Sequence, residues 1–147
     1  MRWLIALVLA VGLSTTAFAA DQLPDLKGTW TGPAKAIVFG NNAYHPGTQK
    51  PSDPPRVREQ SYTFEIEGQD GRVLWGRTFA TVNPDHWEPL ALAILADDKT
   101  IVGSDADGSH YLTIVSPDRL ERCYTHNGTS PTQSIVASCG FLERVKK

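Results

Sequence analysis

The chain has 147 residues, of which 41% are hydrophobic and 20% are charged, and its formal net charge is −2. These values are typical of a single globular domain, and the length is too short for two domains with sizeable cores. The small acidic excess argues against nucleic acid as a partner, because phosphates require clustered positive charge.

The first 19 residues have the pattern of a cleavable secretory signal. Arg2 precedes an apolar stretch from Trp3 to Leu13, and Ala17-Phe18-Ala19 supplies the small residues that signal peptidase requires. We predict cleavage after Ala19, with Ala20 as the alternative. The remaining domain, residues 20–147, has 13 basic and 16 acidic residues, a net charge of −3. No segment is long and apolar enough to span a membrane, so the mature protein is expected in the periplasm or outside the cell.

Short runs of β-branched and aromatic residues, separated by Gly, Pro, Asn and Asp, recur through the mature part and indicate an all-β sandwich or barrel. Eight strands are predicted: Thr29–Phe39, Gln60–Glu67, Arg72–Val82, Leu90–Ala96, Thr100–Ser104, His110–Val115, Leu120–His126 and Ser134–Val145. The Leu90–Ala96 run also has helix propensity, but its period of two and short length favour a strand. Pro33 lacks a ladder N–H and predicts a bulge or an edge in the first strand.

The connections between these strands differ in length. Tight turns are predicted at residues 68–71, 97–99 and 116–119, whereas the other connections are mostly longer, the longest being residues 40–59. In an up-and-down meander, alternate connections lie at opposite ends of the sheet, so the tight turns share one end. The sequence therefore predicts an eight-stranded antiparallel up-and-down barrel with a closed base and an open mouth.

Cys123 and Cys139 are the two cysteines of the chain. In an exported protein such a pair is expected to be oxidised. If the last two strands pair symmetrically about Pro131, Cys123 lies directly opposite Cys139, with Glu121 opposite Phe141. Directly opposed residues are close enough for a disulfide, so we predict this bond and this register.

Gly28-Thr29-Trp30, at the start of the first strand, resembles the calycin superfamily of lipocalins, avidins and their relatives. In those proteins the indole of a Gly-x-Trp motif closes the base of the barrel, and a basic residue near the end of the last strand lies across it. The resemblance implies that role for Trp30 and places Arg144 over its ring, an arrangement that cation–π attraction favours. It implies the fold and no particular ligand.

The candidate ligand-binding residues are aromatic and basic residues of the strands and of the loops at the mouth: Tyr44, Tyr62, Trp75, Arg77, Trp87, Tyr111, Arg122 and Tyr124. Either face of the third strand could point into the barrel. If Trp75 and Arg77 point inward, Arg77 is a buried cation that needs a carboxylate or an anionic ligand. Otherwise Leu74 and Thr78 line the interior. Arg122, which shares a face with Leu120 and Tyr124, poses the same question.

The sequence contains no strong catalytic or metal-binding motif. The four histidines, His45, His86, His110 and His126, lack ligand spacing, although three are expected near the mouth. Asp105-Ala106-Asp107-Gly108 begins like a calcium loop, but the distal acidic ligand is missing, so we interpret it as a turn. No nucleophile elbow is present. We predict no metal and no cofactor, and the oligomeric state stays open.

Three functional hypotheses follow. The first is an exported, non-enzymatic barrel that binds a small, partly apolar ligand at its open end, with an aromatic lining and a few polar anchors. The second is a protein-interaction module such as a periplasmic protease inhibitor, which an exposed apolar patch would favour. The third and least favoured is an enzyme, for which a histidine and a carboxylate within hydrogen-bonding distance would be needed.

Overall fold

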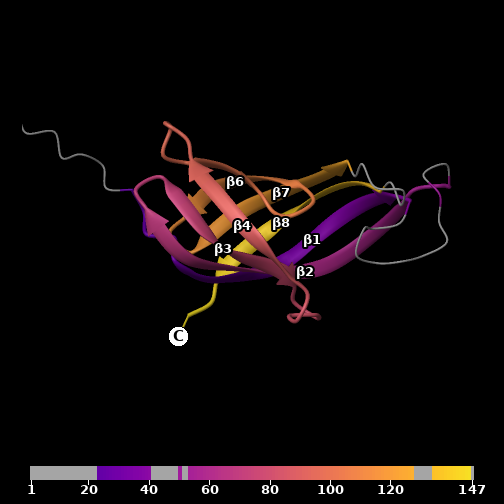
Figure 1. The fold of residues 1–147 in the computed structure, drawn as a ribbon, viewed down its shortest axis with the longest axis horizontal. Coiled ribbons are helices and arrows are strands. Elements are labelled where there is room, and N and C mark those ends of the chain that lie inside the picture. Colours follow the sequence, from indigo (N-terminus) through magenta and orange to yellow (C-terminus); the bar gives the residue numbers. More distant parts are fainter. Residues whose placement is uncertain (1–22, 41–49, 51–52, 128–133, 147) are drawn as a thin grey trace, which may run out of the picture.

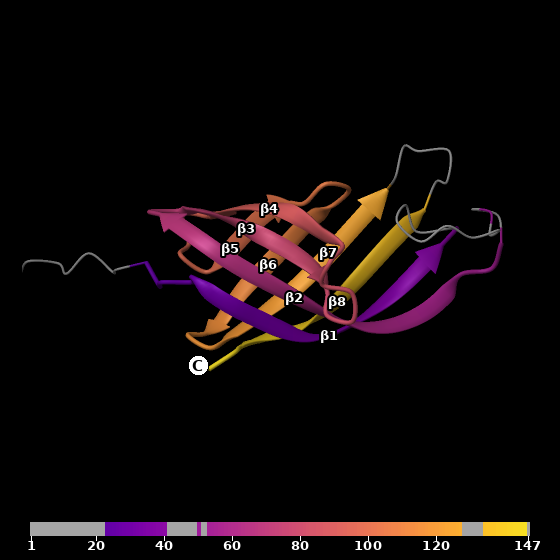
Figure 2. The ribbon, with the colours of Figure 1, turned by 60° about the horizontal axis from the view of Figure 1, so that its bottom comes forward.

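A computed structural model describes residues 23–40, 50, 53–127 and 134–146, and within them the chain forms a closed antiparallel barrel. Its strands are β1 (Gly28–Phe39), β2 (Arg56–Asp70), β3 (Val73–Ala80), β4 (Trp87–Ile94), β5 (Thr100–Ser104), β6 (Ser109–Ser116), β7 (Arg119–Asn127) and β8 (Ile135–Arg144). Each strand pairs with its neighbour in the chain, and β1 also pairs with β8 (Figures 1 and 2). The predicted eight-stranded up-and-down barrel is confirmed.

All strands except β5 differ from their predicted bounds, β2 and β4 the most. β2 begins at Arg56 rather than Gln60, because a polar segment continues the ladder with β1 beyond the apolar run. Residues 90–94 of the predicted Leu90–Ala96 run lie in strand β4, which starts earlier, at Trp87, and ends at Ile94. Its period of two decides the structure, since Leu90, Leu92 and Ile94 are all buried on the inner face.

The predicted disulfide is present between β7 and β8. Cys123 and Cys139 are paired residues of the ladder with Cα atoms 4.1 Å apart, and Glu121 pairs with Phe141 as expected. This bond lies on the outer face of the barrel, because the residues that alternate with Cys123 on β7, Leu120, Arg122 and His126, are buried inside.

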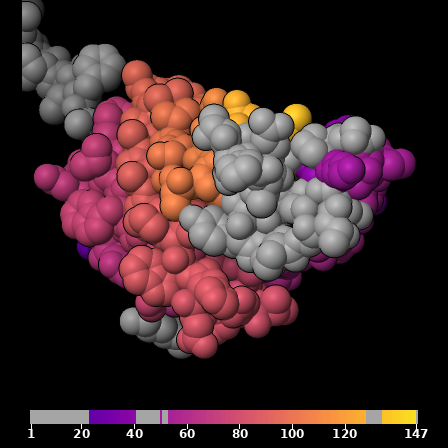
Figure 3. Space-filling view, turned by 45° about the vertical axis from the view of Figure 1, so that its right-hand side comes forward, coloured from indigo at the N-terminus to yellow at the C-terminus, as the bar shows by residue number. Residues whose placement is uncertain are grey.

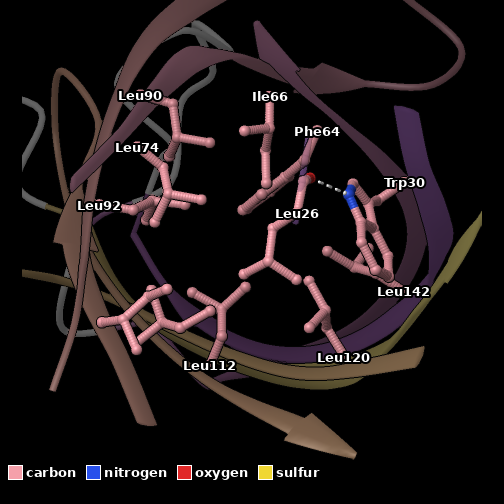
Figure 4. Close-up of a cluster of buried hydrophobic side chains, with 12 residues drawn as sticks. Leu26, Trp30, Phe64, Ile66, Leu74, Leu90, Leu92, Leu112, Leu120 and Leu142 are labelled. Carbon is pink, nitrogen blue, oxygen red and sulfur yellow. Dashed lines mark hydrogen bonds between the residues drawn. The ribbon is translucent and has the colours of Figure 1, made fainter. Parts of the chain in front are cut away.

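One end of the barrel, here called the base, is filled by apolar side chains. The cluster consists of Leu26, Trp30, Phe64, Ile66, Leu74, Leu90, Leu92, Ile94, Ile101, Leu112, Leu120 and Leu142. Leu26 enters this end from the segment before β1 and lies in the middle of the ring of side chains, and its carbonyl accepts a hydrogen bond of 2.9 Å from the Trp30 indole (Figure 4). The burial of this cluster is the main source of the fold's stability.

Arg144 closes the base from outside. Its guanidinium carbon lies 4.1 Å from the centroid of the Trp30 ring, which is the arrangement that the calycin resemblance implies. The guanidinium also donates hydrogen bonds to the carbonyls of Asp25, Lys27 and Pro117. The segment before β1 and the β6–β7 turn are thereby fixed to the last strand.

The seam between β1 and β8 contains Pro33, where the structure corrects the prediction of a bulge or an edge. The β1–β8 pairs are interrupted at Gly32 and Pro33 and resume at Ala34 in the same register, while the ladder with β2 is continuous. A β-carbon on Gly140 would lie 2.0 Å from the Pro33 carbonyl oxygen, so the two strands touch here at a distance that only glycine permits.

The predicted signal peptide lies outside the described residues. Within the described ranges, no helix reaches the length and hydropathy that a membrane span would require.

Candidate functional site

The inner face changes from apolar to polar toward the end of the barrel opposite the base, here called the mouth. Along β7, the inward residues run from Leu120 in the core to Arg122, Tyr124 and His126. Figure 3 turns this end forward, with the outer ends of β1 and β2 in purple at its right. Of the two alternatives left open for Arg122, the inward one is therefore observed.

Arg122 is a buried cation surrounded by aromatic rings. The residue is only 2% exposed. Its guanidinium carbon lies 4.6, 5.0 and 5.6 Å from the ring centroids of Tyr62, Tyr124 and Phe64. One terminal nitrogen donates to the Ser138 hydroxyl at 3.4 Å, and Nε has no partner among the described residues. Burial lowers the pKa of Arg122, which reflects the cost of removing the charge from water.

Three carboxylates gather at the mouth, at the ends of the strands beyond this arginine. Glu88 comes from the start of β4, and Asp105 and Asp107 come from the β5–β6 turn. One oxygen of each lies within 4.8 Å of the others. The turn forms because the Asp105 carboxylate accepts hydrogen bonds from the backbone N–H groups of Asp107 (3.2 Å) and Gly108 (2.8 Å). The interpretation of residues 105–108 as a turn is thus confirmed.

Asp105 is paired with His110 of β6, whose Nε2 lies 2.7 Å from a carboxylate oxygen. Burial lowers the pKa of His110 and outweighs the effect of the carboxylate, so the neutral ring donates this hydrogen bond. Burial alone would raise the pKa of Asp105, but the hydrogen bonds from His110, Gly108 and Asp107 outweigh it and lower that pKa. Asp105 is therefore the ionised partner.

Asp107 contacts two inward side chains of β7, those of Tyr124 and His126. Its carboxylate accepts a hydrogen bond from the Tyr124 hydroxyl, and its backbone carbonyl contacts Nδ1 of His126. Burial and this carboxylate raise the pKa of Tyr124 above its ordinary value, so the phenol keeps its proton. Because Asp105 and Asp107 already have partners, Glu88 is the least constrained of the three acids.

Glu88 has a raised pKa. Burial is the largest cause, followed by the charges of Asp105 and Asp107, and together they raise the pKa of Glu88 to about 7. Among the described residues, its hydrogen-bond donor is the backbone N–H of Ala106 at 3.3 Å. Three carboxylate oxygens at this spacing could also approach a divalent cation, although two of the groups are engaged by His110 and Tyr124.

The other predicted ligand-binding residues lie elsewhere. Trp75, Arg77, Trp87 and Tyr111 are on the outer face: the three aromatic residues are 49–55% exposed, and Arg77 forms an ion pair with Glu65 at 2.5 Å. On β3 the inner residues are Leu74 and Thr78, which are buried, and Arg77 meets its carboxylate on the outside of the neighbouring strand. Tyr44 lies outside the described residues. Only Tyr62, Arg122 and Tyr124 meet at the mouth.

Sequence reasoning missed the three carboxylates as a group. The sequence indicates a turn at Asp105 and Asp107 and gives no signal for Glu88, because 17 positions separate it from Asp105 and the sheet brings them together. The one available signal was that His110, His126 and the 105–108 turn were all expected near the mouth.

Comparisons with known proteins find similar proteins but do not assign the chain to a family. No family model matches the chain. Protein rot1 of Aspergillus oryzae is 28% identical over 115 residues, which are 78% of this chain and 47% of that protein, so the chain spans about half its length. The calycin resemblance therefore stays a prediction at the family level.

Similar solved structures include EF1p2_mFAP2b bound to DFHBI, with 11% identity, a TM-score of 0.47 and coverage of 86% of this chain and 97% of that one. A redesigned β-barrel, b11L5F_LGL, has 13% identity, a TM-score of 0.45 and coverage of 90% and 100%. The S-type phycobiliprotein lyase CPES from Guillardia theta has 12% identity, a TM-score of 0.36 and coverage of 83% and 89%. These similarities concern the barrel alone.

Proposed function

We propose that residues 20–147 form an exported, non-enzymatic barrel that binds a small, partly apolar ligand at its mouth. The observation that carries this proposal is Arg122, a cation on the inner face whose Nε has no partner among the described residues. An unpaired buried polar group costs stability, and natural proteins retain such costs mainly at functional sites.

The composition of the mouth supports a binding site. Tyr62 and Tyr124 provide aromatic surface beside the Arg122 guanidinium, and Ser138 adds a hydroxyl. Small-molecule sites are typically apolar and aromatic with a few polar anchors. The base is filled by the apolar cluster, so a ligand would enter only from the mouth.

Export is proposed on the signal-like residues 1–19 and on the disulfide. A structural disulfide persists in oxidising compartments such as the periplasm or the extracellular space.

Catalysis is less well supported than binding. The hydrogen bond between His110 and Asp105 meets the geometric requirement for a histidine–carboxylate pair. However, the other ring nitrogen of His110 has no partner among the described residues, so no hydroxyl there is positioned as a nucleophile. The His110 side chain is also fully buried.

A second candidate function, a protein-interaction module, is favoured by the outer face of β3–β8. An uncharged row of paired residues crosses these strands: Val73, Ala93, Val102, Tyr111, Cys123 and Cys139. Trp75 lies beside this row and is half exposed. If this face carries the function, replacing Trp75 and Tyr111 by serine should abolish partner binding and leave ligand binding at the mouth unchanged.

The test of the first function uses N-phenyl-1-naphthylamine, a neutral fluorescent probe, together with native mass spectrometry for a retained ligand. Ala36 of β1 lies beside Ser138 on the inner face, whereas Ile37 points outward. We expect the native protein to bind the probe, Ala36→Phe to lose at least about tenfold in affinity through steric exclusion, and Ile37→Phe to bind normally. Absence of both probe binding and a retained ligand would contradict the proposal, as would equal binding by two folded variants.

A further inference from the structure

The positive charge of Arg122 has no counterion in the described part of the chain. A guanidinium stays protonated in proteins, so burial cannot be relieved by loss of the proton. No carboxylate of a described residue lies within 4.0 Å of its nitrogens, although Asp105 is near enough to influence it electrostatically. A buried charge of this kind is costly unless it is paired.

The surrounding groups satisfy the charge only in part. Aromatic rings attract the face of a guanidinium but do not accept the in-plane N–H groups. The Ser138 hydroxyl is neutral and lies at 3.4 Å, at the long limit of a hydrogen bond. Asp105, the acid whose charge acts on Arg122, is engaged by His110, and Asp107 is engaged by Tyr124. The missing acceptor must therefore come from outside the described side chains.

Resting on the proposed function, we propose that the ligand is an organic anion whose acidic group binds Arg122 and whose apolar body lies against Tyr62 and Tyr124, the two partly exposed rings beside it. A carboxylate, sulfonate or phosphate presents two oxygens that match the planar N–H groups of arginine. These two rings beside the guanidinium form a surface suited to a flat, unsaturated body.

The three carboxylates of the mouth carry the opposite charge to Arg122, so they restrict where an anionic group can bind. Glu88, Asp105 and Asp107 lie near the entrance and favour a cation there. Asp105 and Asp107 are held by neighbouring donors, and Glu88 carries a partial charge near neutral pH because its pKa is about 7. The anionic group is therefore expected below the acids, at Arg122, and a cationic ligand would bind at the rim instead.

Two probes with the same ring system separate these cases. The neutral probe is N-phenyl-1-naphthylamine, and the anionic one is 8-anilino-1-naphthalenesulfonate, which adds a sulfonate. We expect the native protein to bind the sulfonate more tightly, by at least about tenfold, the scale of a charge-assisted hydrogen bond. Arg122→Met should remove this preference while neutral-probe binding persists, and Arg122→Lys should retain part of it.

The matched control is Arg77→Met on the outer face, where Arg77 pairs with Glu65. This variant loses the same charge and should keep the full preference. Circular dichroism reports whether each variant folds. If Arg122→Met does not fold, the comparison of Arg122→Lys with Arg122→Gln replaces it, and the glutamine variant should show no preference.

The outcomes distinguish the two proposals. If the neutral probe binds but the native protein shows no preference for the sulfonate, or if folded Arg122→Met retains the preference, the anion inference is wrong and the binding function stands. If neither probe binds and no ligand is retained, the binding function itself fails.

Discussion

Arg122 and Arg144 show how differently two arginines stacked on aromatic rings can be satisfied. Arg144 lies over Trp30 and donates to the backbone carbonyls of Asp25, Lys27 and Pro117. Arg122 has three rings around it but, within the described part of the chain, one long hydrogen bond to a hydroxyl. The contacts of Arg144 stabilise the fold, whereas the guanidinium of Arg122 keeps an Nε–H group without a partner among the described residues. This contrast is why we assign structure to Arg144 and ligand recognition to Arg122.

Glu88 gives a prediction at this scale. Its pKa is about 7 in the folded chain and about 4.3 when unfolded, so between these values the folded state holds more protons and stability falls as pH rises. Glu88→Gln stays neutral and should avoid that loss. Because Glu88 is only half-buried, the gain at pH 8 is discounted for solvent screening to the order of 1 kcal/mol in the free energy of unfolding.

Urea unfolding at pH 8 and pH 4 checks this expectation. The two proteins should differ at pH 8 and nearly agree at pH 4, where Glu88 is mostly protonated in both states. An equal difference at both pH values would mean that the substitution acts through packing and not through the charge.

Single elements were predictable to different degrees. The β7–β8 hairpin followed from two cysteines placed symmetrically about a turn, and its register is confirmed. The inner face of β3 was not predictable, because Leu74 and Thr78 alternate with Trp75 and Arg77 and both faces could have served. The register between β2 and β3 decides it, because it buries Leu74 and places Arg77 opposite Glu65 on the outer face.

The disulfide supplies the prediction for this scale. It closes a loop of sequence separation 16, for which chain entropy gives about 3 kcal/mol of stabilisation. The double variant Cys123→Ser, Cys139→Ser should lose about that amount in chemical denaturation. Because both residues lie on the outer face, the folded variant should bind the neutral naphthylamine probe as the native protein does. A folded variant without probe binding would show that the disulfide also shapes the mouth.

The whole barrel was predictable from the spacing of strands and turns, but the polar cluster of the mouth was not. Short turns at one end and long loops at the other indicate a closed barrel and show which end is the base and which is the mouth. The cluster joins Glu88 of β4, the β5–β6 turn and the inner residues of β7, so it depends on three registers and on which face of each strand is inside. No single segment carries that information.

Closure itself depends on the β1–β8 seam. A β-carbon at position 140 would lie 2.0 Å from the Pro33 carbonyl oxygen, so Gly140→Ala must push the strands apart. We expect a loss of roughly 3 kcal/mol in the free energy of unfolding. The control is Gly71→Asn in the β2–β3 turn, where φ is +53°, a β-carbon meets nothing within 4 Å, and asparagine tolerates this conformation. If Gly140→Ala is as stable as the native protein, the close contact between β1 and β8 does not require glycine at this position.

The contacts of Arg144 also determine how the molecule can be handled. They fix the segment before β1 and the end of β8 at the same pole, where the C-terminal label lies in Figures 1 and 2. A linker attached after β8 would anchor every copy on a sensor surface by that pole. The opposite rim of each copy would then face the flowing solution, so an immobilised layer should report the solution affinity without loss from random orientation.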